Sequence, residues 1–447
     1  MFNLNMCSIK NLTDLKTFNT FVDTAADPYK SVAIFGAGVS GQAARRLALS
    51  LKMEACLFDQ GGGGDASEFS VASLSEFDVC VFSPGFAVAH PWRVVAEGSG
   101  LPCYSELGFA ALYWRGSVLG VTGTNGKTTI VSLLCDAFVA AGETAVVAGN
   151  IGMPLSDCVL GEANHVEATA VCEISSFQAE LPNGLQLDGL IWSNFAEDHL
   201  DRYDSMAEYF AAKSQLLSCL RPGARSVLGV DVLAFDPKLS GIPGSIVVNE
   251  NSGLIDRLAP DSPFRISPQS INFSLAVALW RALDRPVESL VDSANVFQLA
   301  AHRLSPVDSW GGVTFWNDSK ATNFHAALAA IGGLDGRVYW IGGGSCKGGD
   351  FDAFARSIAS KVEAVFLYGE VADSLAASLG LIHSYVEIHS DLVDAVAAAT
   401  HAALANTPSV VLLSPGFASF DQFSGYAARG KTFISTVFSL KDAHYLN

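Results

Sequence analysis

The sequence predicts an α/β protein with three domains, each built around a mainly parallel sheet. Short apolar runs alternate with helical periodicity along almost all of the 447 residues, a pattern typical of parallel α/β architecture. The chain is too long for one ordinary core, since a domain commonly holds about 150 residues. Half of the residues are apolar, which supplies enough material for buried sheets.

Charge and cysteine content limit the classes of partner. The formal net charge is −18, which argues against nucleic acid or an anionic membrane because both reward excess lysine and arginine. The nine cysteines include no C-x-x-C pair, as expected of reduced, mostly buried thiols. Segment 1–30 lacks the pattern of a signal peptide, and no apolar run reaches the length of about 18 residues that spans a membrane. We therefore expect a cytoplasmic protein that binds neither nucleic acid nor membrane.

The predicted elements follow apolar runs and helical spacing. The candidate strands are 32–35, 55–58, 78–82, 117–122, 168–174, 189–195, 313–318, 338–343, 363–369 and 409–413. Helical periodicity is clearest in 128–141, 206–220, 269–284 and 391–405. It is weakest in 231–268, which we interpret as short antiparallel strands or loops. Boundaries near 115 and 300 give domains of 1–115, 116–300 and 301–447.

The first domain contains a pattern that binds diphosphates. Strand 32–35 leads into a turn with Gly36, Gly38 and Gly41, and Asp59 follows the next strand 18 positions after the last glycine. The glycines open a helix N-terminus for a diphosphate, and the acid can accept from a ribose or a base. Diphosphates other than NAD fit equally well, and Asp59 is alternatively a solvated turn residue. Ser83-Pro84-Gly85 forms a second turn at a strand end.

The central domain begins with a phosphate loop. Residues 120–129, Gly-Val-Thr-Gly-Thr-Asn-Gly-Lys-Thr-Thr, run from an apolar strand into a helix. Gly123 and Gly126 let backbone N–H groups turn inward, Lys127 supplies a positive charge, and the hydroxyl of Thr128 suits a phosphate-bound Mg²⁺. Val121 stands where the strict pattern requires its first glycine. The alternative is a simple strand-to-helix turn with an exposed lysine.

Two polar side chains follow later strands of this domain. We interpret strands 168–174 and 189–195 as neighbours, so that Glu173 and His199 lie at the edge where the phosphate loop opens. A carboxylate and an imidazole there can share a Mg²⁺, although either residue alone is more often structural. Lys213 lies in a helix with an apolar face, where chemistry alone favours a lysine that reaches to solvent.

Three strand ends in the last domain carry polar or cationic groups in turns. The segments at these strand ends are 317–323, 342–347 and 414–423. Lys320 and Lys347 lie in the first two of these segments. Such a set indicates a site for a small anionic molecule, with a carboxylate as the favoured ligand. The alternative is that both lysines are exposed solubilising charges.

Several motifs together resemble the ATP-dependent Mur ligases of peptidoglycan synthesis and their folylpolyglutamate synthase relatives. The resemblance is carried by Gly-Thr-Asn-Gly-Lys-Thr at 123–128, Glu-Asp-His-Leu-Asp-Arg-Tyr at 197–203 and His302-Arg303. Segments 83–85, 175–178, 317–322, 413–415 and 421–423 are similar to the D-glutamate-adding branch.

This resemblance implies a monomeric enzyme with a Rossmann-like UDP-binding domain, a central ATPase domain and a C-terminal Rossmann-like domain that binds the amino acid. It implies ATP and two Mg²⁺ ions as cofactors. The implied reaction joins D-glutamate to UDP-N-acetylmuramoyl-L-alanine through an acyl phosphate in the synthesis of cell-wall precursors.

The resemblance also implies roles for individual residues. The implied ATP-binding residues are Gly123, Thr124, Asn125, Gly126, Lys127, Thr128, Thr129, Arg303 and Asp318. The implied metal-binding residues are Thr128, Glu173, His199 and, if carbamylated, Lys213; the implied catalytic residues are Lys127, Glu173, His199 and Lys213. The implied residues that bind the UDP substrate are Val39, Ser40, Asp59, Ser83, Gly85, Asn150 and Ser175. The implied residues that bind D-glutamate are Thr322, Lys347, Ser414 and Phe423.

The sequence departs from the family pattern twice. Gln60 to Gly64 lacks a side chain that often helps to bind UDP, and Ser-Pro-Gln-Ser-Ile-Asn at 267–272 replaces Gly-x-His-Asn near the adenine. Three alternatives stay open. They are a sibling ligase for another amino acid, a nicotinamide oxidoreductase, and a non-catalytic relative that keeps the fold and binds a nucleotide.

Overall fold

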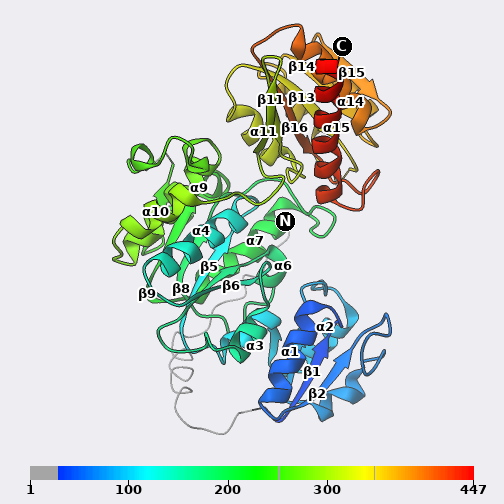
Figure 1. The fold of residues 1–447 in the computed structure, drawn as a ribbon. Helices are drawn as coiled ribbons and strands as arrows, with labels where there is room; N and C mark the ends of the chain where they lie inside the picture. Colours follow the sequence, from blue (N-terminus) through cyan, green and yellow to red (C-terminus); the bar gives the residue numbers. More distant parts are fainter. Residues whose placement is uncertain (1–28, 250–251, 347, 447) are drawn as a thin grey trace. The chain divides into compact units, whose positions relative to one another are not determined.

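The computed structural model describes residues 29–249, 252–346 and 348–446. The chain divides into two compact units, Met1–Tyr104 and Ser105–Asn447, and each is described by itself. In the described chain one sheet is centred on the first unit and two lie in the second (Figure 1). Most of their strand pairs are parallel, which confirms the predicted α/β fold class.

The sheet of the first unit has the strand order β2-β1-β3-β4, and β1 pairs in parallel with both β2 and β3. Its strands are β1 Ser31–Phe35, β2 Glu54–Phe58, β3 Val79–Phe82 and β4 Cys103–Ser105; its helices are α1 Val39–Ser50 and α2 Pro91–Gly98, with a 3₁₀ turn at Val71–Glu76. Helix α1 begins directly after the glycine turn that follows β1 and buries Ala43, Ala44 and Leu47. The turn therefore brings a helix N-terminus to the carboxyl end of the sheet.

The second unit begins with a fully parallel sheet of order β10-β9-β8-β5-β7-β6. Its strands are β5 Ser117–Thr122, β6 Ala145–Gly149, β7 Thr169–Glu173, β8 Leu187–Trp192, β9 Leu220–Gly229 and β10 Ser245–Val248. Its helices are α3 Glu106–Ala111, α4 Lys127–Ala140, α5 Leu155–Leu160, α6 Ser176–Ala179, α7 Met206–Ser214, α8 Val230–Phe235, α9 Gln269–Ala282 and α10 Glu288–Val296.

Burial on both faces explains the apolar strands of this sheet. Helices α4, α9 and α10 share a core with strands β5 and β7 that includes Leu119, Val121, Phe138 and Trp280. A second core around Trp192 joins β8 to α7 and α8. Parallel sheets covered by helices read as continuous apolar runs, as β5 does. The polar residues that follow each strand are left to form the carboxyl edge.

The second unit ends with a sheet of order β11-β12-β16-β13-β14-β15, in which only the β11–β12 pair of the described ladders is antiparallel. Its strands are β11 Ser305–Trp310, β12 Val313–Asn317, β13 Arg337–Gly343, β14 Ala364–Tyr368, β15 Val386–His389 and β16 Ser409–Gly416. Its helices are α11 Phe324–Gly332, α12 Phe351–Ile358, α13 Ala372–Leu379, α14 Leu392–Leu404 and α15 Tyr426–Leu446.

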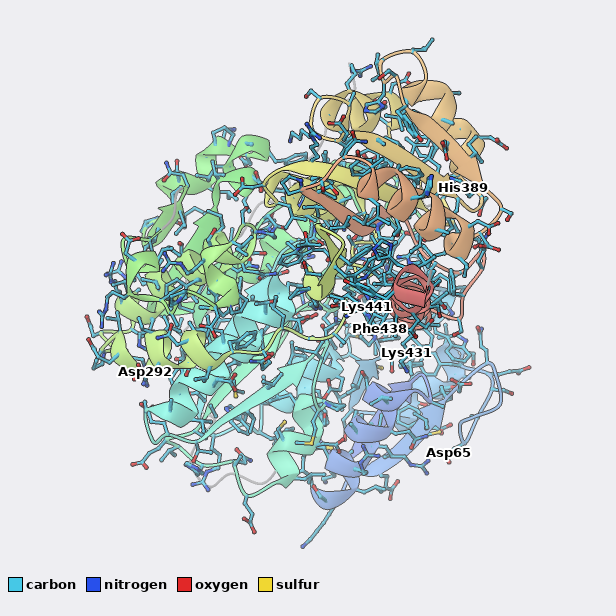
Figure 2. All side chains as sticks on the ribbon, turned by 45° about the horizontal axis from the view of Figure 1, so that its top comes forward. Asp65, Asp292, His389, Lys431, Phe438 and Lys441 are labelled. Atoms are coloured by element: carbon cyan, nitrogen blue, oxygen red, sulfur yellow. The ribbon has the colours of Figure 1, made fainter. Side chains whose placement is uncertain are left out.

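Helices cover both faces of this sheet too. Along β13, Trp340 enters one core, whereas Tyr339 and Ile341 enter the other, as the two-residue period of a strand requires. Helix α15 packs through Phe433 and Val437 and carries Lys431, Phe438 and Lys441 (Figure 2). The Lys441 ammonium forms a 2.8 Å ion pair with Asp308 on β11, which ties the end of α15 to the sheet.

All ten predicted strands and all four predicted helices are present, with 206–220 split into α7 and a 3₁₀ turn at Gln215–Cys219. Six further strands were not predicted: β4, β6, β9, β10, β11 and β15. The interpretation of 231–268 was wrong in part, because β10 pairs in parallel with β9 and short helical turns fill much of the rest. The domain boundaries near 115 and 300 stay predictions.

Candidate active site

The loop between β5 and α4 has a backbone that only glycine permits at two positions. Gly123 has φ of +144°, and a Cβ there would lie 2.0 Å from Ser193 Oγ. Gly126 has φ of +85°, and a Cβ there would lie 2.4 Å from Asn272 Oδ1. The end of β8 holds this loop from below, since the Asn125 N–H donates to Asn194 Oδ1 at 2.8 Å. The loop shape is therefore set before any ligand arrives.

Two lysines contact this loop, and one of them, Lys213, is buried. Lys127 is the first residue of α4, and its Nζ donates to the carbonyls of Gly123 and Thr124 at 2.8 and 2.9 Å. Lys213, on α7, is 1% exposed, and its Nζ donates to Gly123 O at 3.0 Å. Burial lowers the pKa of Lys127, and burial together with the charge of Lys127 holds the pKa of Lys213 well below its usual range.

A chain of hydrogen bonds crosses the edge of the central sheet. Thr128 Oγ1 donates to Glu173 Oε2 at 2.8 Å, and Asn150 Nδ2 donates to Glu173 Oε1 at 2.9 Å. Arg303, from the segment before β11, donates to Thr128 Oγ1 at 3.0 Å. The structure thus brings Thr128 and Glu173 into contact, and it adds Asn150 and Arg303 on either side.

His199 lies in the segment that follows β8. Its backbone has φ of +57°, a conformation that is uncommon without glycine and often marks a functional residue. Its ring packs 4.9 Å from the ring of Phe177 and 5.9 Å from that of Tyr209. The expectation that Glu173 and His199 follow neighbouring strands was wrong, because β5 lies between β7 and β8. Both residues nevertheless line one cavity.

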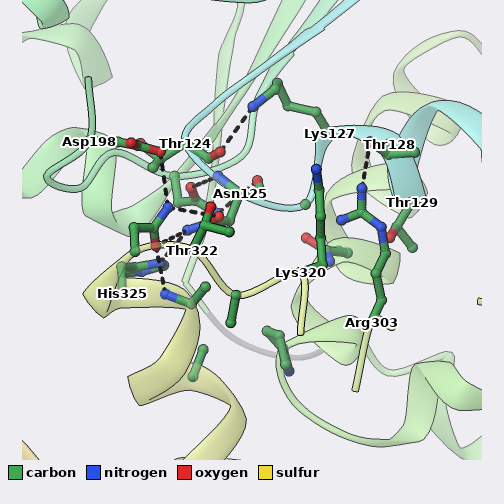
Figure 3. Close-up of a pocket in the computed structure, with 18 of the residues that line it drawn as sticks. Thr124, Asn125, Lys127, Thr128, Thr129, Asp198, Arg303, Lys320, Thr322 and His325 are labelled. Carbon is green, nitrogen blue, oxygen red and sulfur yellow. Dashed lines mark hydrogen bonds between the residues drawn. The ribbon is translucent and has the colours of Figure 1, made fainter. Parts of the chain in front are cut away.

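That cavity has a volume of about 610 Å³ and is lined by residues of the central and C-terminal sheets. Figure 3 shows Arg303 and Lys320 pointing toward the loop that carries Lys127 and Thr128. Lys320 Nζ lies 4.0 Å above the ring of Tyr426, which positions a cation at the cavity wall. The predicted ATP, metal and catalytic residues on its wall are Thr124, Asn125, Gly126, Lys127, Thr128, Thr129, Glu173, His199, Lys213, Arg303 and Asp318.

The predicted D-glutamate residues are placed differently from one another. Thr322 lines the cavity. Ser414 is fully buried and donates to Asp318 Oδ2 at 2.8 Å, while burial raises the pKa of Asp318 to about 7. Phe423 packs against the core under α15. Lys347 lies outside the described residues.

The predicted UDP residues of the first unit surround its glycine turn. Asp59 accepts from the N–H groups of Ala37 and Gly61, both at 2.9 Å, and these bonds lower the pKa of its carboxyl group, that of Ala37 most. Ser83 Oγ donates to Gly36 O at 3.4 Å, and Val39 is 74% exposed at the start of α1. Ser40 follows it on α1, and Gly85 is exposed after β3. Asp59 thus fixes the turn rather than lying free as a solvated residue.

The comparisons with known proteins agree along most of the chain. The family described as Mur ligase middle domain matches residues 121–244, and the one described as Mur ligase, glutamate ligase domain, matches 302–417. A relative from Nitrosomonas europaea is 35% identical over 393 residues, which cover 80% of this chain and 82% of the relative. The chain belongs to the Mur ligase family. The Nitrosomonas relative is named UDP-N-acetylmuramoylalanine–D-glutamate ligase.

Further relatives and solved structures are also similar to this Mur ligase. The Mycolicibacterium smegmatis protein of the same name is 32% identical, with 92% of this chain and 97% of that protein covered. The structure of UDP-N-acetylmuramate-alanine ligase MurC from Thermotoga maritima matches with a TM-score of 0.54 and 14% identity, and covers 92% of this chain and 99% of MurC. MurF from the same organism, in complex with ADP, has a TM-score of 0.55 and 14% identity over 91% of this chain and 93% of MurF. The solved structures support the fold. Among the described residues, no helix is long and apolar enough to cross a membrane.

Sequence reasoning missed the contacts that join the phosphate loop of this Mur ligase to α11. The side-chain amides of Asn125 and Asn323 exchange hydrogen bonds of 3.2 and 3.3 Å, and Asn323 also donates to Asp198 Oδ2 at 3.0 Å. His325 Nδ1 lies 3.1 Å from Asn125 Nδ2, and its Nε2 lies 3.5 Å from Asp231 Oδ2. Asn323 was within a segment singled out at a strand end, but nothing in the sequence indicated its partner.

The segment that departs from the family pattern forms part of the cavity wall. Pro268, Gln269 and Asn272 all line it. Asn272 Nδ2 donates to Gln269 Oε1 at 2.8 Å; both side chains are buried, and that of Asn272 lies next to Gly126. Two amides therefore stand beside the phosphate loop where the family usually has a histidine and an asparagine.

Proposed function

We propose that this Mur ligase uses ATP to join D-glutamate to UDP-N-acetylmuramoyl-L-alanine. The observation that carries the proposal is the cavity of about 610 Å³, because it combines a phosphate loop with cationic and polar groups of the glutamate ligase domain. The names of the relatives support the choice of substrates. A nicotinamide oxidoreductase would leave Lys127, Thr128 and His199 without a task. We further propose that the enzyme acts as a monomer in the cytoplasm.

The loop fits a nucleoside triphosphate. Lys127 Nζ donates to two backbone carbonyls, and anionic phosphate oxygens are stronger acceptors for an ammonium. Arg303 approaches the same helix N-terminus through Thr128. Asp318 positions the segment around Arg303, since its Oδ1 accepts from the Leu304 N–H at 3.0 Å. We propose that the triphosphate lies along this loop, with the base toward Gln269 and Asn272.

The residues present also fit Mg²⁺. No group of three or more His, Cys, Asp or Glu in the described chain could hold a metal by itself. Magnesium, however, needs only one or two protein oxygens beside water and phosphate, and Thr128 with Glu173 provides a hydroxyl and a carboxylate in contact. When bound, the metal would neutralise charge that develops on the phosphates. We assign Thr128 and Glu173 to one ion and His199 to a second.

Lys213 would join the second ion only after modification. Its lowered pKa favours the neutral amine, whose nitrogen can attack the carbon of CO₂ to form a carbamate with loss of one proton. The product is a carboxylate-like oxygen ligand in a position where the unmodified lysine offers none. We therefore propose that Lys213 acts as the carbamate.

The proposed reaction consists of two successive displacements. An oxygen of the alanyl carboxylate attacks the γ-phosphorus of ATP, and ADP leaves. The amine of D-glutamate then attacks the acyl carbon, a tetrahedral intermediate collapses, and phosphate leaves as the amide forms and the amine loses a proton. Lys127 and Arg303 supply fixed positive charge near the transferred group, which is the main requirement of phosphoryl transfer. Lys320, Thr322 and the residues behind them would hold the amino acid.

Two sets of residues are assigned to the other substrate. We assign its UDP to the glycine turn with Val39, Ser40 and Asp59, and to Ser83 and Gly85. We assign its alanyl end to Asn150 and Ser175, because both line the cavity. The domains 1–115, 116–300 and 301–447 remain the units that we propose for these three tasks.

Release of inorganic phosphate from ATP tests the function. The assay is run with UDP-N-acetylmuramoyl-L-alanine and a panel of amino acids that includes D-glutamate, L-glutamate, L-lysine and D-alanine. We expect release only when both substrates are present, with D-glutamate preferred. Release with another amino acid would indicate a sibling ligase, and no release under any combination would refute the ligase.

A further inference from the structure

Arg429 is a fully buried cation in the C-terminal domain. It lies in the first turn of α15 and has 0% of its surface exposed. It forms no ion pair within the described parts of the chain. A buried arginine is usually paired with a carboxylate because burial of an isolated charge is costly. Its position therefore requires another explanation.

The guanidinium instead donates to neutral acceptors on two loops and on the last residue of β13, where a third loop begins. Its Nε and Nη2 donate to Oγ and the carbonyl of Ser319 at 3.0 and 2.8 Å. Its Nη1 donates to the carbonyls of Phe417, Ala418 and Gly343 at 3.0, 3.3 and 3.4 Å. The planar fork of arginine presents several donors in a rigid geometry, so one side chain fixes all three loops at once.

These loops are the ones that follow β12, β13 and β16 at the carboxyl edge of the sheet. The loops after β13 and β16 also contact each other, since the Ser345 N–H donates to Ala418 O at 2.9 Å. Gly344 permits this approach, because a Cβ there would lie 2.0 Å from Ala418 O and 3.2 Å from Arg429 Nη1. Arg429 thus occupies the point where the three loops converge.

The same loops carry every residue that the proposed function assigns to the amino acid. Thr322 and Lys320 follow β12, Lys347 follows β13, and Ser414 and Phe423 lie at or after the end of β16. The positive charge of Arg429 also acts within this edge, where with Arg303 it opposes the effect of burial on the pKa of Asp318. A binding site made of three separate loops depends on their spacing, and displacement by about 1 Å weakens both binding and reaction.

We propose that Arg429 is a positioning residue that sets the geometry of the amino-acid site by tying the loops after β12, β13 and β16 together. This inference rests on the proposed function, because it takes these loops as the site of the incoming amino acid. Arg429 itself is buried behind the loops and need not touch the substrate. Its loss should therefore change the KM of the amino acid and leave the nucleotide loop unaffected.

The experiment measures phosphate release by the full chain with Arg429→Lys, Arg429→Met and Ser319→Ala. Ser319→Ala removes one acceptor and is the mildest change. Lys431→Gln removes a positive charge from an exposed position two residues along the same helix and serves as the matched control (Figure 2). Thermal unfolding of each variant reports general damage to the fold.

We expect the KM of the amino acid to rise about tenfold or more in Arg429→Met, less in Arg429→Lys, and least in Ser319→Ala. The KM values of ATP and of the UDP substrate should stay within about twofold of wild type, and Lys431→Gln should behave as wild type. A lower melting temperature with an unchanged KM for the amino acid would overturn the proposal, as would an equal rise in all three KM values. If Arg429→Met does not fold, Arg429→Lys and Ser319→Ala decide by the same criteria.

Measurements on the wild-type enzyme distinguish a failure of this proposal from a failure of the proposed function. Each variant is measured with the amino acid that the wild type uses best in the panel. A preference for an amino acid other than D-glutamate would refute the assigned substrate, yet the KM shifts would still test Arg429.

Discussion

Lys127 and Lys213 donate hydrogen bonds to the same carbonyl oxygen, that of Gly123, at 2.8 and 3.0 Å. Two ammonium groups that share one acceptor in a buried site repel each other, so one of them is favoured in its neutral form. The pKa of Lys213 is the one held well below its usual range, by burial first and by Lys127 second. Burial lowers the pKa of Lys127 as well, but less, so Lys127 is the better cation for phosphate and Lys213 is the amine that can react.

Replacing Lys127 by Met should abolish phosphate release. The methionine keeps the length and apolar stem of the side chain but removes the charge that faces the transferred phosphate. We expect turnover to fall by at least about a hundredfold, in line with the loss of one charge-stabilising group. Binding of the UDP substrate, measured by calorimetry, should change little. Unchanged turnover would contradict the assignment of this loop to ATP.

Lys213 should make the activity depend on CO₂. Enzyme depleted of CO₂ under inert gas should lose most of its turnover and regain it when bicarbonate is added, because the carbamate forms reversibly. Carbon-13 bicarbonate should give a carbamate signal in the NMR spectrum of the wild type that is absent from Lys213→Ala. Lys441→Ala, at a partly buried ion pair between α15 and β11, is the control. Full activity of Lys213→Ala would rule out a role for the carbamate.

The parts of the site that the sequence predicted are those with local signals. The loop from β5 to α4 is one continuous segment in which an apolar strand, two glycines, a lysine and a helix succeed one another. Each of these properties is determined by neighbours a few positions away. The positions after two further strands extended the prediction to Glu173 and His199, which do line the same cavity.

The parts that were missed depend on tertiary arrangement. Asn125 and Asn323 are 198 positions apart, and their reciprocal amide contact exists only because two sheets face one cavity. The order of β7, β5 and β8 likewise depends on crossover connections that no strand sequence encodes alone. The unpredicted β11 has the sequence Ser-Pro-Val-Asp-Ser-Trp. This polar composition suits an antiparallel edge strand, but a search for apolar runs does not detect it.

Glu180 should contribute strongly to stability near His199. Its carboxylate accepts from Arg202 Nε and Nη2 at 2.9 and 2.8 Å and from the hydroxyl of Tyr203 at 2.8 Å, all largely buried. This cluster ties the segment that contains His199 to the end of α6. Glu180→Ala leaves Arg202 buried without this partner, and we expect the free energy of unfolding to fall by about 3–5 kcal/mol.

Urea denaturation measures this effect, and an exposed pair of the same domain provides the control. Arg257 and Glu288 lie 3.4 Å apart with side chains that are 46% and 65% exposed. Glu288→Ala should therefore change the free energy of unfolding by less than about 1 kcal/mol. Equal effects of the two substitutions would show that burial of the Glu180–Arg202 pair is not what stabilises this segment.

Glu106 should make stability depend on pH in a direction opposite to that of most carboxylates. It is 2% exposed, its Oε1 accepts from the Ser156 N–H at 2.8 Å, and burial raises its pKa from 4.5 to about 7. The folded protein thus binds this proton more tightly than the unfolded chain. The contribution is full below the unfolded pKa of 4.5 and is lost as pH rises toward about 7, by about 3 kcal/mol in all.

Glu106→Gln isolates this contribution, because the amide oxygen can still accept from Ser156 but carries no proton to lose. We compare the free energy of unfolding of wild type and variant by urea denaturation between pH 4 and pH 8. Asp318, whose pKa is also raised to about 7, is present in both proteins and cancels in the difference. Wild type should lose stability relative to the variant as pH rises from about 4.5 to 7, with a constant difference above that range. A difference that does not change with pH would show that Glu106 is ionised in the folded protein with an ordinary pKa.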